Sequence, residues 1–141
     1  MIDSWTSSGE APAIRGWLLL LCLLLLAWQP ANLALVASGT LDALPIRGLP
    51  FALVLATRVL AAGIGIAAGI ALLGHAGAAV ALAKVALTAS AAADLLVYLT
   101  PYSPSNRMPG DTPIYVVATL VYYAGWMSYL VRSRRVRETF R

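Results

Sequence analysis

Long apolar segments alternate with short polar ones along the whole chain. Four of these segments have the roughly 20 apolar residues that an α-helix needs to cross a hydrocarbon core of about 30 Å. They run from about 16 to 37, 50 to 73, 76 to 99 and 113 to 131. The pattern predicts an all-α polytopic membrane protein: an antiparallel bundle of four transmembrane helices, in one domain covering residues 1–141.

Proline and glycine positions mark the ends of these helices. Pro50 and Pro113 suit the first turn of a helix, where the missing N–H is not needed. Gly74 and Gly77 enclose a very short connection, so the second and third helices are expected to form a tight hairpin. Three prolines fall between residues 100 and 112, which predicts a loop there.

Pro30 lies inside the first apolar segment. The residues from Trp17 to Trp28 reach only about 16 Å as a helix, too little to cross the membrane. The helix is therefore expected to continue past Pro30 and to kink there. Gln29 and Asn32 flank this position, and we expect them to face the bundle interior and satisfy the interrupted helix rather than bind a ligand.

The composition excludes an ordinary soluble domain. Of 141 residues, 60% are apolar and only 11% are charged, which is more apolar surface than so small a soluble domain can bury. The net charge of +4 does not indicate nucleic-acid binding, because half of the ten basic residues lie in a tail at 132–141. A basic cluster directly after an apolar segment is a membrane-topology signal.

The distribution of lysine and arginine predicts the orientation. The side of the membrane that holds both termini carries Arg15 and the tail residues Arg132, Arg134, Arg135, Arg137 and Arg141, whereas the opposite loops carry only Arg47 and Arg107. Basic residues collect on the cytoplasmic side. Both termini are therefore expected in the cytoplasm. Trp17, Trp126, Tyr129, Tyr102 and Tyr115 fall near the expected interfaces, as in an aromatic belt.

Three ionisable residues, Arg58, Lys84 and Asp94, lie inside the apolar segments. A charge at the centre of a membrane helix costs about 2.5–3.5 kcal/mol on insertion scales, so it normally has a partner or a task. In a hairpin that turns near residue 75, residues at equal depth have numbers that sum to about 150. Arg58 and Asp94 sum to 152, which predicts an ion pair between the second and third helices.

Two interpretations of these charges stay open. The favoured one is that Arg58 and Asp94 form a structural pair, while Lys84, about 15 Å away along its helix, extends its ammonium group toward the cytoplasmic interface. The other is a proton or solute pathway in which Asp94 titrates. A carboxylate held in an ion pair is a poor proton carrier, which favours the first. Ser90, Asp94 and Tyr98 recur every fourth residue and are expected to form a polar stripe.

Small residues predict where the helices pack most closely. Gly65 and Gly69 form a small-xxx-small pair in the second helix, and the third helix is rich in alanine from Ala76 to Ala93. Such residues let helix backbones approach in lipid, where no hydrophobic drive acts between helices. We expect them to seal the hairpin between the second and third helices.

The sequence contains no motif for catalysis or metal binding. Cys22 is alone in an apolar run, His75 is the single histidine, and no carboxylates are paired at metal-ligand spacing. There is no phosphate-binding glycine loop, zinc-protease helix or nucleophile elbow. We therefore predict a protein without enzymatic activity, metal or cofactor.

The two ends of the chain carry a family resemblance. The opening Ile14–Leu21 (IRGWLLLL) and the closing Trp126–Phe140 (WMSYLVRSRRVRETF) resemble the bacterial inner-membrane family catalogued as domain of unknown function 2569. The chain departs from that pattern at Arg15, where a glycine is usual, and at Ser128, where a proline is usual. The resemblance implies a four-helix protein of the bacterial inner membrane with a meaningful tail, and it implies no activity.

These observations lead to two hypotheses for function. The first is a non-enzymatic accessory or interaction subunit that engages partner proteins, a second copy of itself, or anionic lipid. In this view the tail arginines contact lipid headgroups from an amphipathic segment, in which Val136 and Phe140 share one face. The alternative is a small dimeric transporter with Asp94 as the coupling residue. Neither hypothesis involves nucleic acid.

Overall fold

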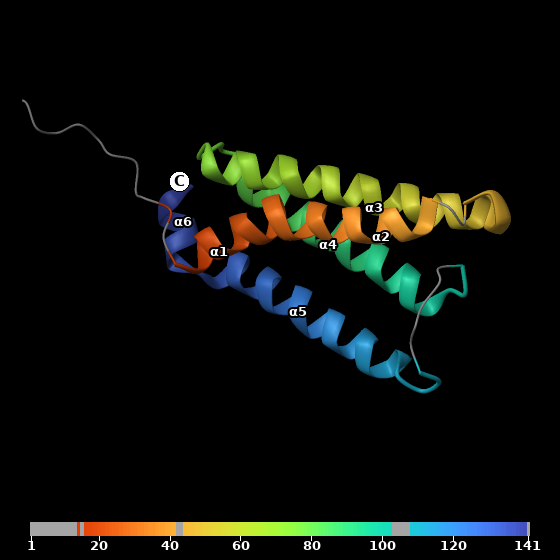
Figure 1. Cartoon of the computed structure of the whole chain (residues 1–141). Helices are drawn as coiled ribbons and strands as arrows, with labels where there is room; N and C mark the ends of the chain where they lie inside the picture. The colour runs from red at the N-terminus through yellow and green to blue at the C-terminus, as the bar shows by residue number, and fades with distance from the viewer. Residues whose placement is uncertain (1–13, 15, 42–43, 103–107, 141) are drawn as a thin grey trace, which may run out of the picture.

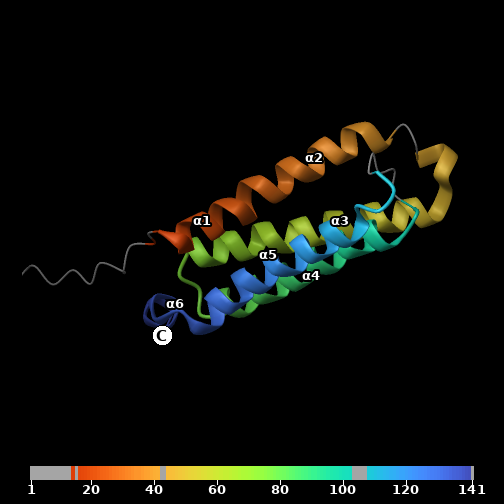
Figure 2. The same ribbon diagram turned by 90° about the horizontal axis from the view of Figure 1, so that it is seen from below.

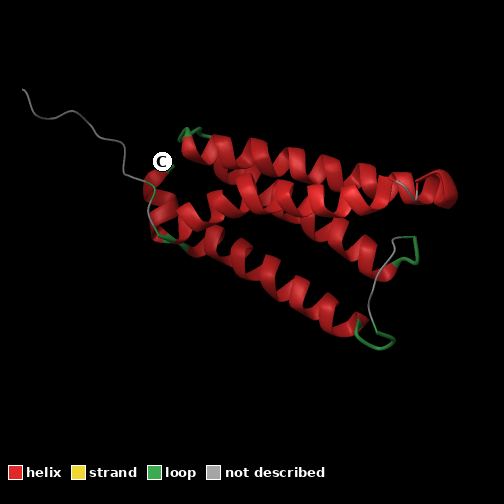
Figure 3. Cartoon of the chain, viewed as in Figure 1, coloured by secondary structure: helices red, strands yellow, loops and turns green. Residues whose placement is uncertain are grey.

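The computed structural model describes residues 14, 16–41, 44–102 and 108–140. The described part is helical and contains no strand (Figure 3). Its elements are α1 (Trp17–Leu23), the π-helical turn η1 (Leu24–Trp28), α2 (Gln29–Thr40), α3 (Leu44–Leu73), α4 (Ala79–Leu99), α5 (Thr112–Arg132) and α6 (Arg134–Thr139). The predicted all-α class is confirmed.

Four helical stretches are long and apolar enough to cross a membrane: Trp17–Ser38, Gly48–Leu73, Ala79–Leu99 and Thr112–Arg132. They agree closely with the predicted segments. The largest difference is at the start of the third stretch, expected at residue 76 and found at residue 79. The number and place of the transmembrane helices are therefore as the hydropathy pattern predicts.

The first transmembrane helix passes through Pro30 without ending. Directly before the proline, residues Leu24–Trp28 form a π-helical turn, and the backbone at Trp28 and Gln29 keeps α-helical angles. A proline lacks the N–H donor and its ring crowds the carbonyl four residues earlier, here Leu26. The wider π-helical turn gives room for that ring, so α1, η1 and α2 form one continuous run (Figure 2).

The second transmembrane helix begins at a break. Within α3, Gly48 has φ 70° and ψ −161°, a conformation open to glycine but costly for other residues. Residues before it form a separate helical turn. Pro50 follows in the first turn after the break, where its missing donor is not needed, as predicted from its position.

The connection between α3 and α4 is a Schellman motif with a histidine at its left-handed position. The Ala76 N–H donates to the Ala71 carbonyl oxygen at 3.0 Å and the His75 N–H donates to that of Leu72 at 3.2 Å. His75 has φ 51°. This pattern satisfies the last carbonyls of α3. The left-handed residue is therefore His75, and neither Gly74 nor Gly77 holds that position.

Buried apolar residues occur along the bundle, including Phe51, Val54 and Val97 toward the end away from α6. The main hydrophobic cluster lies at the other end. It joins residues of the first transmembrane helix to the end of α3, the start of α4 and the end of α5: Leu18, Leu21, Cys22, Leu25, Ala68, Leu72, Ala79, Ala83, Ala86, Leu87 and Leu130. These lie at the end where the described chain begins and finishes. From there α5 and α2 diverge toward the other end (Figure 1).

The glycine pair in α3 faces a different partner from the one expected. A Cβ atom on Gly65 would lie 2.2 Å from Gln29 Oε1, and one on Gly69 would lie 2.6 Å from Leu26 Cγ. Both glycines therefore admit the first transmembrane helix, not α4. The expectation that they seal the hairpin was wrong, because the hairpin contact uses alanines: Ala79, Ala83 and Ala86 of α4 are fully buried.

The basic tail folds back against the bundle. In α6 Val136 is 1% exposed and belongs to the apolar core, and the Phe140 ring lies 6.0 Å from the ring of His75. Val136 and Phe140 thus share one face, as expected, but that face contacts protein instead of lipid. Arg132, Arg134, Arg135 and Arg137 remain exposed, and Arg141 lies outside the described residues.

Candidate functional site

Arg58 and Asp94, the two charges matched by depth in the sequence, meet in the structure. Arg58 Nη2 donates to Asp94 Oδ1 at 3.0 Å, joining α3 to α4. The two side chains are 15% and 26% exposed. Charge-assisted bonds of this kind offset the desolvation that each charge would otherwise bear alone.

A third helix bonds to the same carboxylate. The Tyr123 hydroxyl of α5 donates to Asp94 Oδ2 at 2.8 Å, so the two oxygens of Asp94 accept from two different helices. The sequence analysis did not identify Tyr123. Asp94 therefore ties α5 to the hairpin of α3 and α4.

The first transmembrane helix contributes a polar contact next to this pair. Gln29 Nε2 donates to Ser90 Oγ at 2.7 Å, linking α2 to α4. Two polar atoms nearby are left over: Gln29 Oε1 and Arg58 Nε are buried without a hydrogen-bond partner among the described residues. Leaving such an atom unsatisfied costs about 1–3 kcal/mol.

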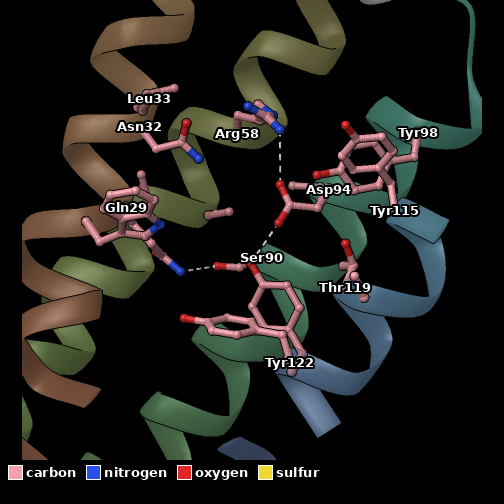
Figure 4. A pocket seen from close by; sticks show the side chains of 16 residues that line it. Gln29, Asn32, Leu33, Arg58, Ser90, Asp94, Tyr98, Tyr115, Thr119 and Tyr122 are labelled. Carbon is pink, nitrogen blue, oxygen red and sulfur yellow. Dashed lines mark hydrogen bonds and ion pairs between the residues drawn. The ribbon is translucent and has the colours of Figure 1, made fainter. Parts of the chain in front are cut away.

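These side chains surround a cavity of about 330 Å³ between the first transmembrane helix and α5 (Figure 4). The cavity lies beyond the main hydrophobic cluster, farther from α6. It is lined by Trp28, Gln29, Asn32, Leu33, Arg58, Ala61, Ala62, Ser90, Ala93, Asp94, Tyr98, Tyr115, Ala118, Thr119, Tyr122 and Tyr123. Cavities of 300 Å³ and more, with a few convergent polar groups, are the usual form of a small-molecule site.

Aromatic rings form much of the wall around Asp94. The Tyr98 and Tyr115 ring centroids are 5.7 Å apart, and those of Tyr122 and Tyr123 are 5.0 Å apart at a steep angle. In Figure 4, Tyr98 and Tyr115 lie together on one side of Asp94 and Tyr122 lies on another. The carboxylate therefore projects into a space bounded by aromatic faces and edges.

The predicted polar stripe faces this cavity. Ser90 is 6% exposed, and Ser90, Asp94 and Tyr98 all contribute to the lining. Gln29 and Asn32 line it too. A purely structural role is predicted for these two, and the bond from Gln29 to Ser90 fits it; their place in the cavity wall leaves that prediction untested.

Lys84 is separate from the site. It does not line the cavity, and no carboxylate in the described part of the chain forms an ion pair with it. It lies five residues, about 7.5 Å, from the start of α4 at the end that carries α6. The described residues likewise hold no group of three metal-binding side chains.

A signal for the α5 contribution is present in the sequence. Tyr115, Thr119, Tyr122 and Tyr123 follow the spacing i, i+4, i+7 and i+8, which places them on one helical face. In a membrane helix this is a polar face, and it marks the side turned toward the cavity. The aromatic-belt interpretation of Tyr115 concealed this pattern, because one tyrosine near a helix end fits a belt equally well.

Comparison with protein-family models, curated proteins and solved structures finds no match for this chain. The family resemblance at the two ends of the chain therefore stays a prediction. Function has to be inferred from the cavity itself, which combines an ion pair, hydrogen-bonding side chains and aromatic walls at membrane depth.

Proposed function

We propose that this membrane protein is a non-enzymatic binding component whose intramembrane cavity holds a small polar molecule or the polar head of a lipid. One observation carries the proposal: the cavity of about 330 Å³ is lined by the Arg58–Asp94 ion pair together with Gln29, Ser90 and several tyrosines. A few convergent polar groups in a concave pocket are the usual form of a small-molecule site.

The distribution of packing supports access from one side. The main hydrophobic cluster fills the end of the bundle that carries α6, and the residues that line the cavity lie farther from that end. Figure 1 shows α2 and α5 diverging in the direction away from α6. A ligand would thus reach the site from the membrane half away from the two termini. With both termini cytoplasmic, as the lysine and arginine distribution predicts, that is the outer half.

Filling the cavity tests this proposal. Ala62 lines the cavity on α3, so Ala62→Phe is expected to exclude a ligand without removing any polar group. Native mass spectrometry of protein extracted from its membrane should show bound small molecules or lipid in the unsubstituted protein and at least a tenfold loss in Ala62→Phe. Ala56→Phe, at an exposed position of the same helix, is the matched control. Equal retention in all three proteins would contradict the proposal.

The exposed tail arginines support a second contact, with anionic lipid at the cytoplasmic face of a bacterial inner membrane. Each basic residue near such a surface contributes about 1 kcal/mol. Replacing Arg134, Arg135 and Arg137 with glutamine should lower the anionic lipid retained by the purified protein several-fold at low salt. Arg47→Gln is the control, because residue 47 lies near the start of α3, at the end of the bundle away from the tail (Figure 1). Retention that ignores both the substitutions and salt would contradict an electrostatic contact.

The transporter alternative rests on Asp94. It would need a second copy of the chain, because four helices seldom enclose a path, and it would need Asp94 to exchange its partners during transport. Asp94 already accepts from Arg58 and Tyr123. These contacts favour a fixed binding site, and the Asp94→Asn experiment described in the Discussion separates the two functions.

A further inference from the structure

The cavity presents both signs of charge within one bonded pair, and this restricts what it can hold. We infer that its ligand is zwitterionic, with an ammonium group beside Asp94 among the tyrosine rings and an anionic oxygen on Arg58. The inference rests on the proposed function, because it assumes that the cavity is a binding site.

Arg58 has donor capacity left for an anionic oxygen. Its Nη2 is bonded to Asp94, while its Nε is buried without a partner among the residues that the structure describes. A guanidinium group carries five N–H donors in a planar fork that matches carboxylate and phosphate oxygens. The buried Nε lies out of reach of the cavity, but the Arg58 side chain is 15% exposed and lines it. An anionic oxygen there would accept from the terminal N–H groups that Asp94 does not use.

Asp94 and its aromatic neighbours suit a cation. Each carboxylate oxygen accepts one hydrogen bond, from Arg58 or from Tyr123, and retains a second lone pair. The side chain is 26% exposed and lines the cavity. Tyr98 and Tyr122 lie on different sides of the carboxylate (Figure 4). An ammonium group held over aromatic faces is attracted by the negative charge density of the rings.

Ligands with a net charge fit this arrangement less well. Arg58 and Asp94 together carry no net charge, so Arg58 repels a simple cation and Asp94 repels a simple anion. Such repulsion is strong where water is scarce, because the effective dielectric constant is low. A molecule with both charges places each beside its opposite and avoids this repulsion.

The cavity lies within reach of a lipid headgroup. Asp94 is five residues, about 7.5 Å, from the end of α4 at the open side. Trp28 and Tyr122, both in the lining, are 63% and 42% exposed, so the cavity wall continues onto the surface that faces lipid. A zwitterionic phospholipid and a free zwitterion share the recognised chemistry, and the experiment has to separate these sources.

The test measures thermal unfolding of the full-length protein, freed of lipid in detergent micelles, with four probes. These are short-chain phosphatidylethanolamine, phosphatidylglycerol with the same chains, glycerophosphoethanolamine without chains, and a cationic trimethylammonium lipid analogue. A saturating zwitterion is expected to raise the unfolding temperature by about 5–10 °C, because it binds the folded state alone. A shift with phosphatidylethanolamine only identifies a lipid; a shift with both ethanolamine compounds identifies the zwitterionic group itself.

Two variants link the shift to the cavity. Arg58→Met with Asp94→Leu removes both charges together, whereas Ala62→Phe fills the cavity but keeps the charges. Each of these two variants should abolish the shift in unfolding temperature. The control Ala56→Phe should retain it. The second variant reports on the site even if the first does not fold. Stabilisation by the anionic or cationic lipid equal to that by the zwitterion would overturn the inference and leave the cavity as a binding site. Absence of any shift would also overturn it, while ligand loss in Ala62→Phe reports separately on the proposed function.

Discussion

Arg58→Ala is expected to lower the free energy of unfolding by about 3–5 kcal/mol, the cost of breaking a buried ion pair from one side. The substitution leaves Asp94 as an uncompensated carboxylate at membrane depth with Tyr123 as its remaining donor. Charges in this position are expensive without a partner. Unfolding of the purified protein in micelles, followed by circular dichroism during denaturant titration, measures the change.

The double variant Arg58→Met with Asp94→Leu is the matched control. Replacing both charges with apolar groups removes the desolvation cost together with the attraction. The Tyr123 hydroxyl loses its acceptor, which costs about 1–3 kcal/mol, so the double variant should be less destabilised than Arg58→Ala. If the double variant is as unstable as Arg58→Ala, the ion pair contributes more to the free energy of folding than the cost of burying its two charges. The structural interpretation would then be wrong.

Asp94→Asn distinguishes binding from transport. Asparagine keeps one of the two acceptor oxygens that Arg58 and Tyr123 use, and it cannot carry a proton. If this variant folds and loses a proton-coupled uptake that the unsubstituted protein catalyses in vesicles, the dimeric transporter is the better description. The proposed binding function instead predicts weaker ligand retention and no uptake to lose.

Gly65→Leu is expected to lower the free energy of unfolding by about 1–3 kcal/mol through overpacking. A Cβ at this position would meet Gln29 Oε1 at 2.2 Å and Gln29 Cδ at 3.2 Å. Gln29 would have to move, which breaks its hydrogen bond to Ser90 and separates the first transmembrane helix from α3. The same micelle titration measures the loss.

Gly63→Leu is a close control for this prediction. A Cβ on Gly63 meets no described atom within 4 Å, and the gain in helix propensity from glycine to leucine is the same at both sites. The control is therefore expected to be neutral or stabilising. Equal destabilisation by the two substitutions would show that Gly65 is not a close contact between helices. A larger effect at Gly63 would indicate that this face of α3 meets another chain.

The depth of each residue could be predicted from the sequence, but its direction around the helix axis could not. Arg58 and Asp94 were matched by counting from the turn at His75, and the structure brings them to 3.0 Å. The same counting could not place Gly65 and Gly69, because both sides of a small-residue helix can accept a neighbour. In the structure that neighbour is the first transmembrane helix.

Polar residues outside the charged set were harder to interpret. Gln29 was recognised as unusual in an apolar segment, but its contact with Ser90 spans 61 positions of sequence. Tyr123 was not singled out in the sequence, and its hydroxyl donates to Asp94 from another helix. Likewise, the shared face of Val136 and Phe140 indicated an apolar contact without showing whether lipid or protein provides it.

The sequence by itself determined that lipid surrounds the helices, where the four transmembrane helices lie along the chain, and at what membrane depth the two paired charges, Arg58 and Asp94, are placed. These depend on the transfer free energy of each residue at its own depth, which is a local property of the chain. Only the tertiary structure decided which helix faces meet, that the main hydrophobic cluster fills one end, and that a polar cavity opens beyond it. In lipid no hydrophobic force selects between faces, so rotation and tilt follow from close packing and hydrogen bonds between residues far apart in sequence.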